Sequence, residues 1–132
     1  MCKFINLPKI LDPRGNLTFF QNYEHIPFEI KRVFWIYDVP GGAYRGGHAN
    51  KIQQELIIAL SGSFDIIVKD RFGDEQKFSL NRSYFGLYVP SNTWRHMENF
   101  STNSVSMHVC STEFDNEDYI RDFELFKTFN HE

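Results

Sequence analysis

The chain consists largely of short runs in which apolar and polar residues alternate, separated by clusters of glycine, proline, asparagine and aspartate. Alternation with a period of two is typical of β-strands that bury one face. The predicted strands are Phe4–Leu11, Asn16–Gln21, Ile30–Tyr37, Leu56–Leu60, Ser63–Lys69, Gln76–Leu80, Tyr84–Val89, Trp94–Met97 and Ser104–Cys110. Short strands at this spacing predict an all-β barrel or sandwich, and the first two are expected to form a hairpin.

The C-terminal segment 115–129 has a different pattern. Tyr119, Phe123, Phe126 and Phe129 recur at three- and four-residue intervals, and acidic residues lead the segment. This spacing places the rings on one face of a helix, and carboxylates are favourable at a helix N-terminus. We therefore expect a C-terminal helix that packs against the β-structure. Because the sequence shows no repeat and no linker, residues 1–132 are interpreted as one domain.

Composition narrows the classes of function. A net charge of −3 without basic runs argues against nucleic acid as the partner. No apolar stretch approaches the ~20 residues that a membrane-spanning helix needs, and the N-terminus has no apolar signal region. Cys2 and Cys110 suit neither a metal motif nor a disulfide framework. We therefore expect a cytoplasmic protein that binds neither nucleic acid nor membrane.

The polar residues that carry chemistry are concentrated between Gly42 and Gly62. His48 and Asn50 are two residues apart, so they face the same side of a strand, and Glu55 follows. The spacing of these residues resembles the first signature of the cupin superfamily, in which a histidine stands at the position of Asn50. The resemblance implies an all-β cupin, or jelly-roll barrel, whose mouth is a favoured place for small-molecule chemistry.

Many cupins bind a metal through histidines and a glutamate. The segment Gly86–Asn99 resembles the second cupin signature, and Arg95 stands where a third metal-binding histidine is expected. A guanidinium is permanently protonated and cannot bind a cation, and Asn50 is a weak ligand. His96 is adjacent to Arg95, but one step along a strand reverses the side chain unless a bulge intervenes. We therefore predict no metal site.

Several segments resemble one narrower family, the WxcM-like nucleotide-sugar 3,4-ketoisomerases. They are Asp12-Pro13-Arg14-Gly15, Ile30-Lys31-Arg32-Val33, Arg45-Gly46-Gly47-His48-Ala49, Gly86-Leu87-Tyr88-Val89, Trp94 and Asp118-Tyr119-Ile120-Arg121. The resemblance implies a homodimer without metal or other cofactor that acts on a dTDP-linked 4-keto-6-deoxyhexose. It further implies that the carbonyl moves from C4 to C3 through an enediol, in the biosynthesis of deoxyaminosugars for surface polysaccharides.

The sequence departs from this family at three places. The second histidine of the family's His-Ala-His motif is Asn50, a histidine after the tryptophan is Arg95, and a tyrosine pair is Phe34-Trp35. His48 is the preferred base because an imidazole has a pKa of ~6.5, although it can instead only hydrogen-bond within the barrel. We expect Asn50 to hold a sugar hydroxyl or the carbonyl, or to satisfy backbone groups. Arg95 is expected to stabilise an enediolate or phosphate oxygen, with a surface salt bridge as the alternative.

The candidates for substrate binding match family segments or lie among aromatic residues near the expected mouth. They are Arg14, Arg32, Arg45, Tyr37, Trp94 and His96. Arg14 and Arg45 are expected at the pyrophosphate, with solvated side chains as the alternative. Trp94 is expected to stack on thymine or to support the site from the core. Glu55 is expected to pair with a nearby base or cation, or to take a packing role.

Other functions compete with the isomerase. A protein that binds the dTDP-sugar without turnover is consistent with the loss of histidine at Asn50 and Arg95. An epimerase that acts on a related 4-keto sugar is also open, because both reactions begin by removing a proton beside the carbonyl. A metal-dependent cupin, such as a dioxygenase, is disfavoured by Arg95.

Overall fold

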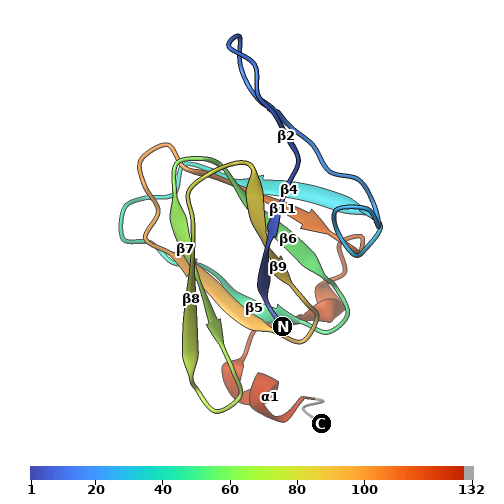
Figure 1. Cartoon of the computed structure of the whole chain (residues 1–132). Helices are drawn as coiled ribbons and strands as arrows, with labels where there is room; N and C mark the ends of the chain where they lie inside the picture. The colour runs from blue at the N-terminus through green and yellow to red at the C-terminus, as the bar shows by residue number, and fades with distance from the viewer. Residues whose placement is uncertain (130–132) are drawn as a thin grey trace.

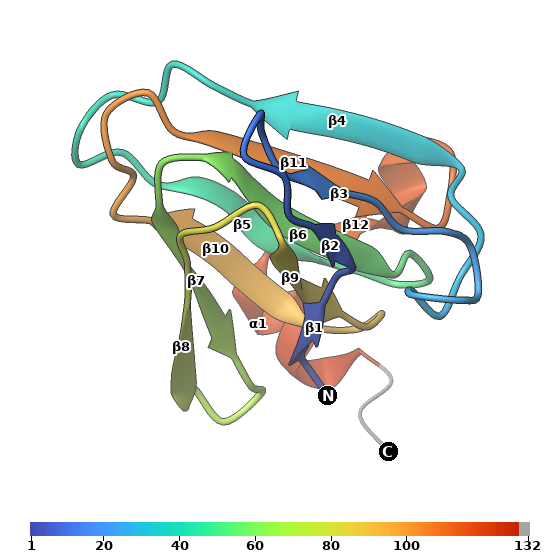
Figure 2. The ribbon, with the colours of Figure 1, turned by 45° about the horizontal axis from the view of Figure 1, so that its top comes forward.

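The computed structural model describes residues 1–129, which form two five-stranded antiparallel sheets packed face to face (Figures 1 and 2). The first sheet contains, in spatial order, β1 (Lys3–Asn6), β9 (Phe85–Val89), β6 (Glu55–Ser61), β11 (Val105–Cys110) and β4 (Arg32–Ile36). The second contains β12 (Tyr119–Ile120), β5 (Arg45–Asn50), β10 (Trp94–Glu98), β7 (Phe64–Lys69) and β8 (Glu75–Leu80). The predicted all-β class is confirmed, as a two-layer sandwich rather than a closed barrel.

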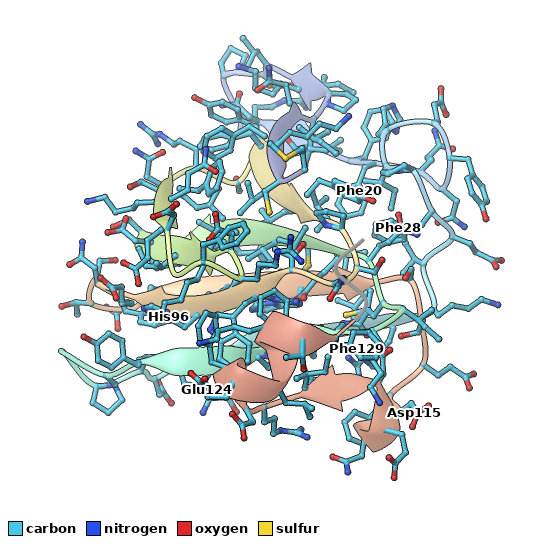
Figure 3. All side chains as sticks on the ribbon, turned by 90° about the horizontal axis from the view of Figure 1, so that it is seen from below. Phe20, Phe28, His96, Asp115, Glu124 and Phe129 are labelled. Carbon is cyan, nitrogen blue, oxygen red and sulfur yellow. The ribbon has the colours of Figure 1, made fainter. Side chains whose placement is uncertain are left out.

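Strand β6 shows why its segment is a continuous apolar run. Ile57 and Ala59 join the central core between the sheets, whereas Leu56 and Ile58 belong to a second core that also contains Phe28. The segment that carries Phe20 and Phe28, both labelled in Figure 3, covers this outer side of the first sheet. A strand that is buried on both faces needs apolar side chains at successive positions, and strict alternation is lost.

The C-terminal helix is present but shorter than the predicted range 115–129. The chain forms a 3-10 turn at Asn116–Asp118, then strand β12, and then helix α1 (Phe123–Thr128). Two contacts explain why the helix begins only at Phe123. Strand β12 pairs with β5, and the Asp122 side chain caps α1 by accepting a hydrogen bond from the backbone N–H of Glu124. Strand pairing therefore overrides the helical spacing of the aromatic residues. No helix in residues 1–129 has the length and apolar character needed to cross a membrane.

The first predicted strand is divided at Pro8. Strand β1 pairs with β9, whereas β2 (Lys9–Ile10) pairs with β3 (Leu17–Thr18), which confirms the expected hairpin. A proline has no N–H to donate and interrupts a strand ladder. The β2–β3 hairpin projects away from the sandwich at the top of Figure 1.

Two turns use the residues that their geometry demands. Gly62, between β6 and β7, has a φ of +67°, and a Cβ there would lie 2.9 Å from the Cα of Ser104. Glycine adopts this backbone conformation without steric cost. In the β7–β8 hairpin, the Asp70 carboxylate accepts hydrogen bonds from the backbone N–H groups of Phe72 and Asp74. This confirms the hairpin turn predicted at residues 70–74.

Candidate active site

His48 and Asn50 share one face of β5, as their spacing predicts, and Nε2 of His48 lies 3.1 Å from Oδ1 of Asn50. Strands β5 and β6 belong to different sheets, and the Glu55 side chain at the start of β6 reaches Arg95 in the second sheet. Arg95 on β10 is opposite His48 in the strand register. Its Nη2 donates to Oδ1 of Asn50 at 2.9 Å and to Oε1 of Glu55. These contacts join the two sheets.

Glu55 is the centre of a buried polar cluster. Its Oε1 pairs with Arg95, and its Oε2 lies 2.5 Å from Nδ1 of His108 on β11. Nε2 of His108 is 2.9 Å from Oγ of Ser106. Burial tends to raise the pKa of the Glu55 carboxyl, but Arg95 and His108 outweigh burial and hold that pKa well below its usual value. Glu55 is therefore ionised at neutral pH and paired on both oxygens, which agrees with the expected contact to a base or cation.

Asp118 fixes the orientation of the Asn50 amide. Nδ2 of Asn50 donates to Oδ2 of Asp118 at 3.1 Å, which leaves Oδ1 of Asn50 facing Arg95. The Asp118 carboxylate also accepts hydrogen bonds from the backbone N–H groups of Ile52 and Gln53. Because an amide oxygen only accepts hydrogen bonds, Nε2 of His48 must donate to it, and the lone pair of the neutral imidazole lies on Nδ1.

His48 is neutral at physiological pH. Burial and the positive charge of Arg95 lower the pKa of its imidazole to about 3, against weaker opposing effects of Glu55, Gly46 and Asn50. The side chain remains half-buried. The ring of Tyr119 packs against it, with 4.9 Å between the ring centroids. His48 is therefore an unprotonated imidazole near the edge of the sandwich, the form that a base requires.

Arg32 lies beside this cluster, at the start of β4. Its Nη2 donates to the hydroxyl of Tyr119 at 3.1 Å and to Oε1 of Gln53 at 3.0 Å. Its guanidinium carbon is 5.2 Å from the ring centroid of Phe34 and 5.4 Å from that of Phe114. The Phe34 ring also stacks on His108 at 4.4 Å. The edges of the two sheets thus contribute an imidazole, a phenol and a guanidinium to one region.

Trp94 and His96 point away from Arg95, on the outer face of the second sheet. Trp94 packs against Phe123 and Phe126 of α1, with ring centroids 5.3 and 5.8 Å apart. Nε2 of His96, labelled in Figure 3, lies 2.7 Å from a carboxylate oxygen of Glu98. The two residues line a cavity of about 410 Å³ together with Tyr44, Gly47, Glu75 and Glu98. Because strand residues alternate between faces, Trp94 and His96 do not reach the Glu55 cluster within one chain.

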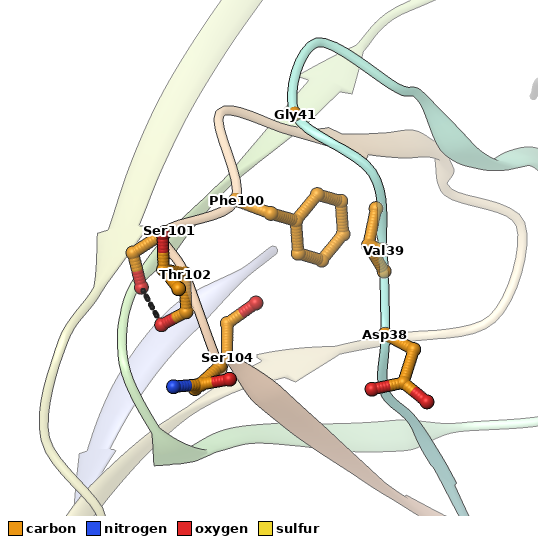
Figure 4. A pocket seen from close by; sticks show the side chains of 8 residues that line it. Asp38, Val39, Gly41, Phe100, Ser101, Thr102 and Ser104 are labelled. Carbon is orange, nitrogen blue, oxygen red and sulfur yellow. Dashed lines mark hydrogen bonds between the residues drawn. The ribbon is translucent and has the colours of Figure 1, made fainter.

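The remaining predicted binding residues lie elsewhere. Arg45 and Tyr37 line a cavity of about 240 Å³, at the end of β5 that is remote from Asn50. Figure 4 shows a further cavity of about 290 Å³ between the Asp38–Gly41 loop and residues Phe100–Ser104. Arg14 is exposed at the tip of the β2–β3 hairpin and pairs with Asp12 at 2.8 Å. Within residues 1–129 of one copy, none of these side chains is hydrogen-bonded to His48 or stacked on it.

Comparison with known proteins places the chain in a family. The family model described as FdtA, WxcM-like, C-terminal, matches residues 1–131. The chain belongs to this WxcM-like family. It is 39% identical over 127 residues to TDP-4-oxo-6-deoxy-alpha-D-glucose-3,4-oxoisomerase of Aneurinibacillus thermoaerophilus, a match that covers 96% of this chain and 91% of that protein.

Solved structures of 3,4-ketoisomerases have the same fold. The TDP-quinovose 3,4-ketoisomerase WlaRB of Campylobacter jejuni superposes with a TM-score of 0.90 at 41% identity, over 96% of each chain. The 3,4-ketoisomerase QdtA of Thermoanaerobacterium thermosaccharolyticum superposes with a TM-score of 0.92 at 32% identity, over 96% of this chain and 91% of that one. That QdtA structure is a variant with one histidine replaced by asparagine, in complex with TDP-4-keto-6-deoxyglucose.

Sequence analysis missed two site residues of this WxcM-like chain, Ser106 and His108, and it named Phe34, Asp118 and Tyr119 without giving them a role in the site. The alternation of residues 104–110 does place Ser106 and His108 on one face, so the sequence alone could have predicted that these two side chains are neighbours. Their contact with Glu55 depends on β11 lying beside β6. Within residues 1–129, no group of three or more His, Cys, Asp or Glu side chains is arranged to hold a metal ion.

Proposed function

We propose that the chain is a dTDP-4-keto-6-deoxyhexose 3,4-ketoisomerase. The observation that carries this proposal is its similarity to 3,4-ketoisomerases, at 39 and 41% identity, over nearly the whole chain. The reaction converts the C4 carbonyl to a hydroxyl and the C3 hydroxyl to a carbonyl. Its product is suited to an aminotransferase, which supports a place in deoxyaminosugar biosynthesis for surface polysaccharides. We place the enzyme in the cytoplasm, where the free thiols of Cys2 and Cys110 stay reduced.

In this proposal His48 is the base. It removes the proton from C3, the enediol forms, and the same imidazole returns a proton to C4. A low pKa keeps His48 unprotonated in the free enzyme, and the negative charges of a bound diphosphate raise its basicity when substrate arrives. Asn50 holds the imidazole by accepting the hydrogen of Nε2, so the lone pair that takes up the proton is on Nδ1.

In this proposal Arg95 does not contact the substrate and acts through Asn50 and His48. Its guanidinium is buried and hydrogen-bonded to Glu55, Asn50 and the backbone carbonyl of Thr93. It therefore orients the Asn50 amide, and its positive charge lowers the pKa of His48. The sequence had suggested a direct contact between Arg95 and an enediolate oxygen, and this proposal replaces that contact. The reaction needs no metal in this scheme.

Arg32 is the arginine best placed to bind the substrate close to His48. Its Nε is buried and has no hydrogen-bond partner in residues 1–129. A buried donor without a partner is costly, and a phosphate oxygen would satisfy it. Arg45 and Tyr37 are proposed to contact the nucleotide at the cavity beside the other end of β5, and Trp94 and His96 to line an outer subsite.

Arg14 can serve the site only through a second copy, and we propose a homodimer. Exposed apolar side chains gather on the β2–β3 hairpin and on the outer face of β4; they are Ile10, Leu11, Leu17, Val33 and Trp35. Surfaces of this kind mark protein interfaces. Sedimentation analysis is expected to give twice the mass of the chain, and Trp35→Glu is expected to give a monomer. A monomeric wild type at ~10 µM, well above nanomolar Kd values, would contradict the dimer.

The direct test of the reaction is an assay with dTDP-4-keto-6-deoxyglucose. The purified chain is expected to form a 3-keto product, trapped as an amino sugar by a coupled aminotransferase and identified by NMR. Treatment with EDTA is expected to leave the rate unchanged, because His48 rather than a metal supplies the proton transfer. Background-level product over hours would exclude the isomerase. An epimerised 4-keto product would support the epimerase instead.

One observation favours a second candidate, a protein that binds the sugar nucleotide without turnover. Asn50 stands where the family has its second histidine, and the QdtA variant that carries asparagine for a histidine was obtained with the keto sugar bound. If this candidate is correct, calorimetry should show micromolar binding of dTDP, and the isomerase assay should give no product. Turnover is then expected to appear on Asn50→His combined with Arg95→His, because Arg95 contacts residue 50 directly.

A further inference from the structure

His108 is a buried imidazole that the proposed mechanism does not use. It lies on β11, opposite Phe34 of β4, and the two rings stack with 4.4 Å between their centroids and 4° between their planes. Nδ1 of His108 lies 2.5 Å from Oε2 of Glu55, and Nε2 lies 2.9 Å from Oγ of Ser106. Both ring nitrogens and one ring face are therefore engaged, which fixes the imidazole from three directions.

A serine, an imidazole and a carboxylate in this order are the parts of a nucleophilic triad. Here the three side chains cannot act on a substrate directly, because Ser106 is fully buried and His108 is only 3% exposed. Glu55 is buried as well, and its other oxygen is paired with Arg95. Any effect of His108 on catalysis therefore passes through the groups that this cluster contacts.

A continuous chain of hydrogen bonds connects His108 with the base. Glu55 accepts from Nδ1 of His108 on Oε2 and from Nη2 of Arg95 on Oε1. The same Nη2 also donates to Oδ1 of Asn50 at 2.9 Å, and that oxygen lies 3.1 Å from Nε2 of His48. Because a guanidinium is planar and rigid, a change in the orientation of Glu55 turns Arg95 and moves the hydrogen that Asn50 accepts.

Two side chains fix the Glu55 carboxylate. Within residues 1–129 it is hydrogen-bonded to Arg95 and His108 alone, one on each oxygen. Without His108, Oε2 would be a buried acceptor that has no donor, which is unfavourable and is relieved when the side chain rotates. Such a rotation weakens the contact between Arg95 and Asn50.

We propose that His108 is a positioning residue for the proton transfer by His48. It holds Glu55 in the orientation from which Arg95 fixes the Asn50 amide. This inference rests on the proposed ketoisomerase activity, and it gives a role in the reaction to an imidazole that never meets the substrate.

The test compares two substitutions of His108. His108→Leu replaces the imidazole with an apolar side chain of similar size and removes the donor to Glu55. We expect it to lower kcat by ~10-fold, as for loss of a group that orients a functional side chain, with KM changed less than ~3-fold. The amide nitrogen of His108→Asn can take the place of Nδ1, so this variant is expected to stay within ~3-fold of the wild-type kcat. Calorimetric titration with dTDP counts the folded sites in each sample.

A spectroscopic measurement reports the positioning without substrate. The hydrogen on Nε2 of His48 is held by Oδ1 of Asn50, and NMR on isotope-labelled protein measures its exchange with water. We expect this exchange to be ~10-fold faster in His108→Leu, because local opening of the hydrogen bond becomes easier, and to be unchanged in His108→Asn. If His108 only filled space, the exchange rate and the kcat of the folded enzyme would stay at their wild-type values.

Ser106→Ala is a milder change that covers the case in which His108→Leu does not fold. It removes one oxygen, frees Nε2 of His108 and is expected to lower kcat by ~3-fold. The matched control is His25→Leu, in the segment between β3 and β4. His25 also has a hydrogen bond at Nδ1 and a ring contact with a phenylalanine, Phe19, and its replacement should leave kcat at the wild-type value.

The outcomes separate this inference from the proposed activity. Equal kcat for His108→Leu and His108→Asn would overturn the positioning role and leave the isomerase in place. If His108→Leu does not fold, wild-type kcat in Ser106→Ala would overturn it in the same way. An absence of product from the wild type would overturn the isomerase and this inference together.

Discussion

Replacing His48 with glutamine is expected to lower kcat by ~10² to 10⁴-fold, the usual contribution of a positioned general base. Glutamine keeps a polar group beside Asn50 but has no nitrogen that accepts a proton. The variant should also lose exchange of the C3 hydrogen with solvent deuterium, because that exchange begins with removal of the proton. Coupled product assays and NMR measure the two effects separately.

The control for this prediction is His25→Gln. Nδ1 of His25 accepts a hydrogen bond from the backbone N–H of Gln21, in the segment that leads to the outer side of the first sheet. We expect His25→Gln to keep wild-type kcat. A His48→Gln enzyme that retains kcat within tenfold of wild type would show that another group removes the proton.

The low pKa of His48 also predicts how kcat/KM depends on pH. The imidazole must be unprotonated to act, and its pKa is about 3 in the free chain because of burial and Arg95. The kcat/KM profile reports the free enzyme, so protonation of His48 should not produce an acid limb near pH 6.5. A limb centred at the ordinary histidine pKa would contradict the environment described for His48.

The largest expected effect on stability follows Glu55→Gln, which should lower the free energy of unfolding by ~3 to 5 kcal/mol. The change removes the charge that balances the buried Arg95 guanidinium and the acceptor for Nδ1 of His108. A buried cation without its partner keeps its desolvation cost and loses its Coulomb attraction. Urea titration at pH 7, monitored by tryptophan fluorescence, measures the loss.

The matched control is Glu29→Gln, which breaks an exposed pair with Lys31 at 3.1 Å. Surface pairs contribute ~0 to 1 kcal/mol, so this variant should be close to wild type. The folded-state pKa of Glu55 is lowered, so its contribution is present above the unfolded pKa of ~4.3 and is lost as pH falls below it. Acid unfolding should therefore be shallower in Glu55→Gln. A loss below ~1 kcal/mol at pH 7 would mean that water or another anion neutralises Arg95.

Two of the departures from the family motifs are in contact. Asn50 and Arg95 share a hydrogen bond of 2.9 Å, and both lie next to His48. The Asn50 oxygen accepts the Arg95 hydrogen bond, whereas an imidazole at residue 50 would have to direct its lone pair at the guanidinium, which would occupy the nitrogen that takes up a proton. The pair therefore functions as a unit, which is why a single Asn50→His change is a poor restoration of the family arrangement.

Local pattern determined much of this protein. Alternation identified most strands, the two-residue spacing placed His48 and Asn50 on one face, and turn residues located the β7–β8 hairpin. These features depend on the backbone period and on neighbouring residues, so a single sequence contains them. The family motifs added the reaction class, which the comparisons with ketoisomerases support.

Only the tertiary structure decided which of these residues meet. Arg95 faces Glu55, while its neighbours Trp94 and His96 lie under α1 and on the outer face, because the second sheet buries one side against the first. Tyr119 lies in a strand because its backbone pairs with the edge of β5. This pairing overrides the helical spacing of the aromatic residues in the sequence. Pairing between distant strands depends on loop closure and on the packing of two whole sheets, and no local period encodes it.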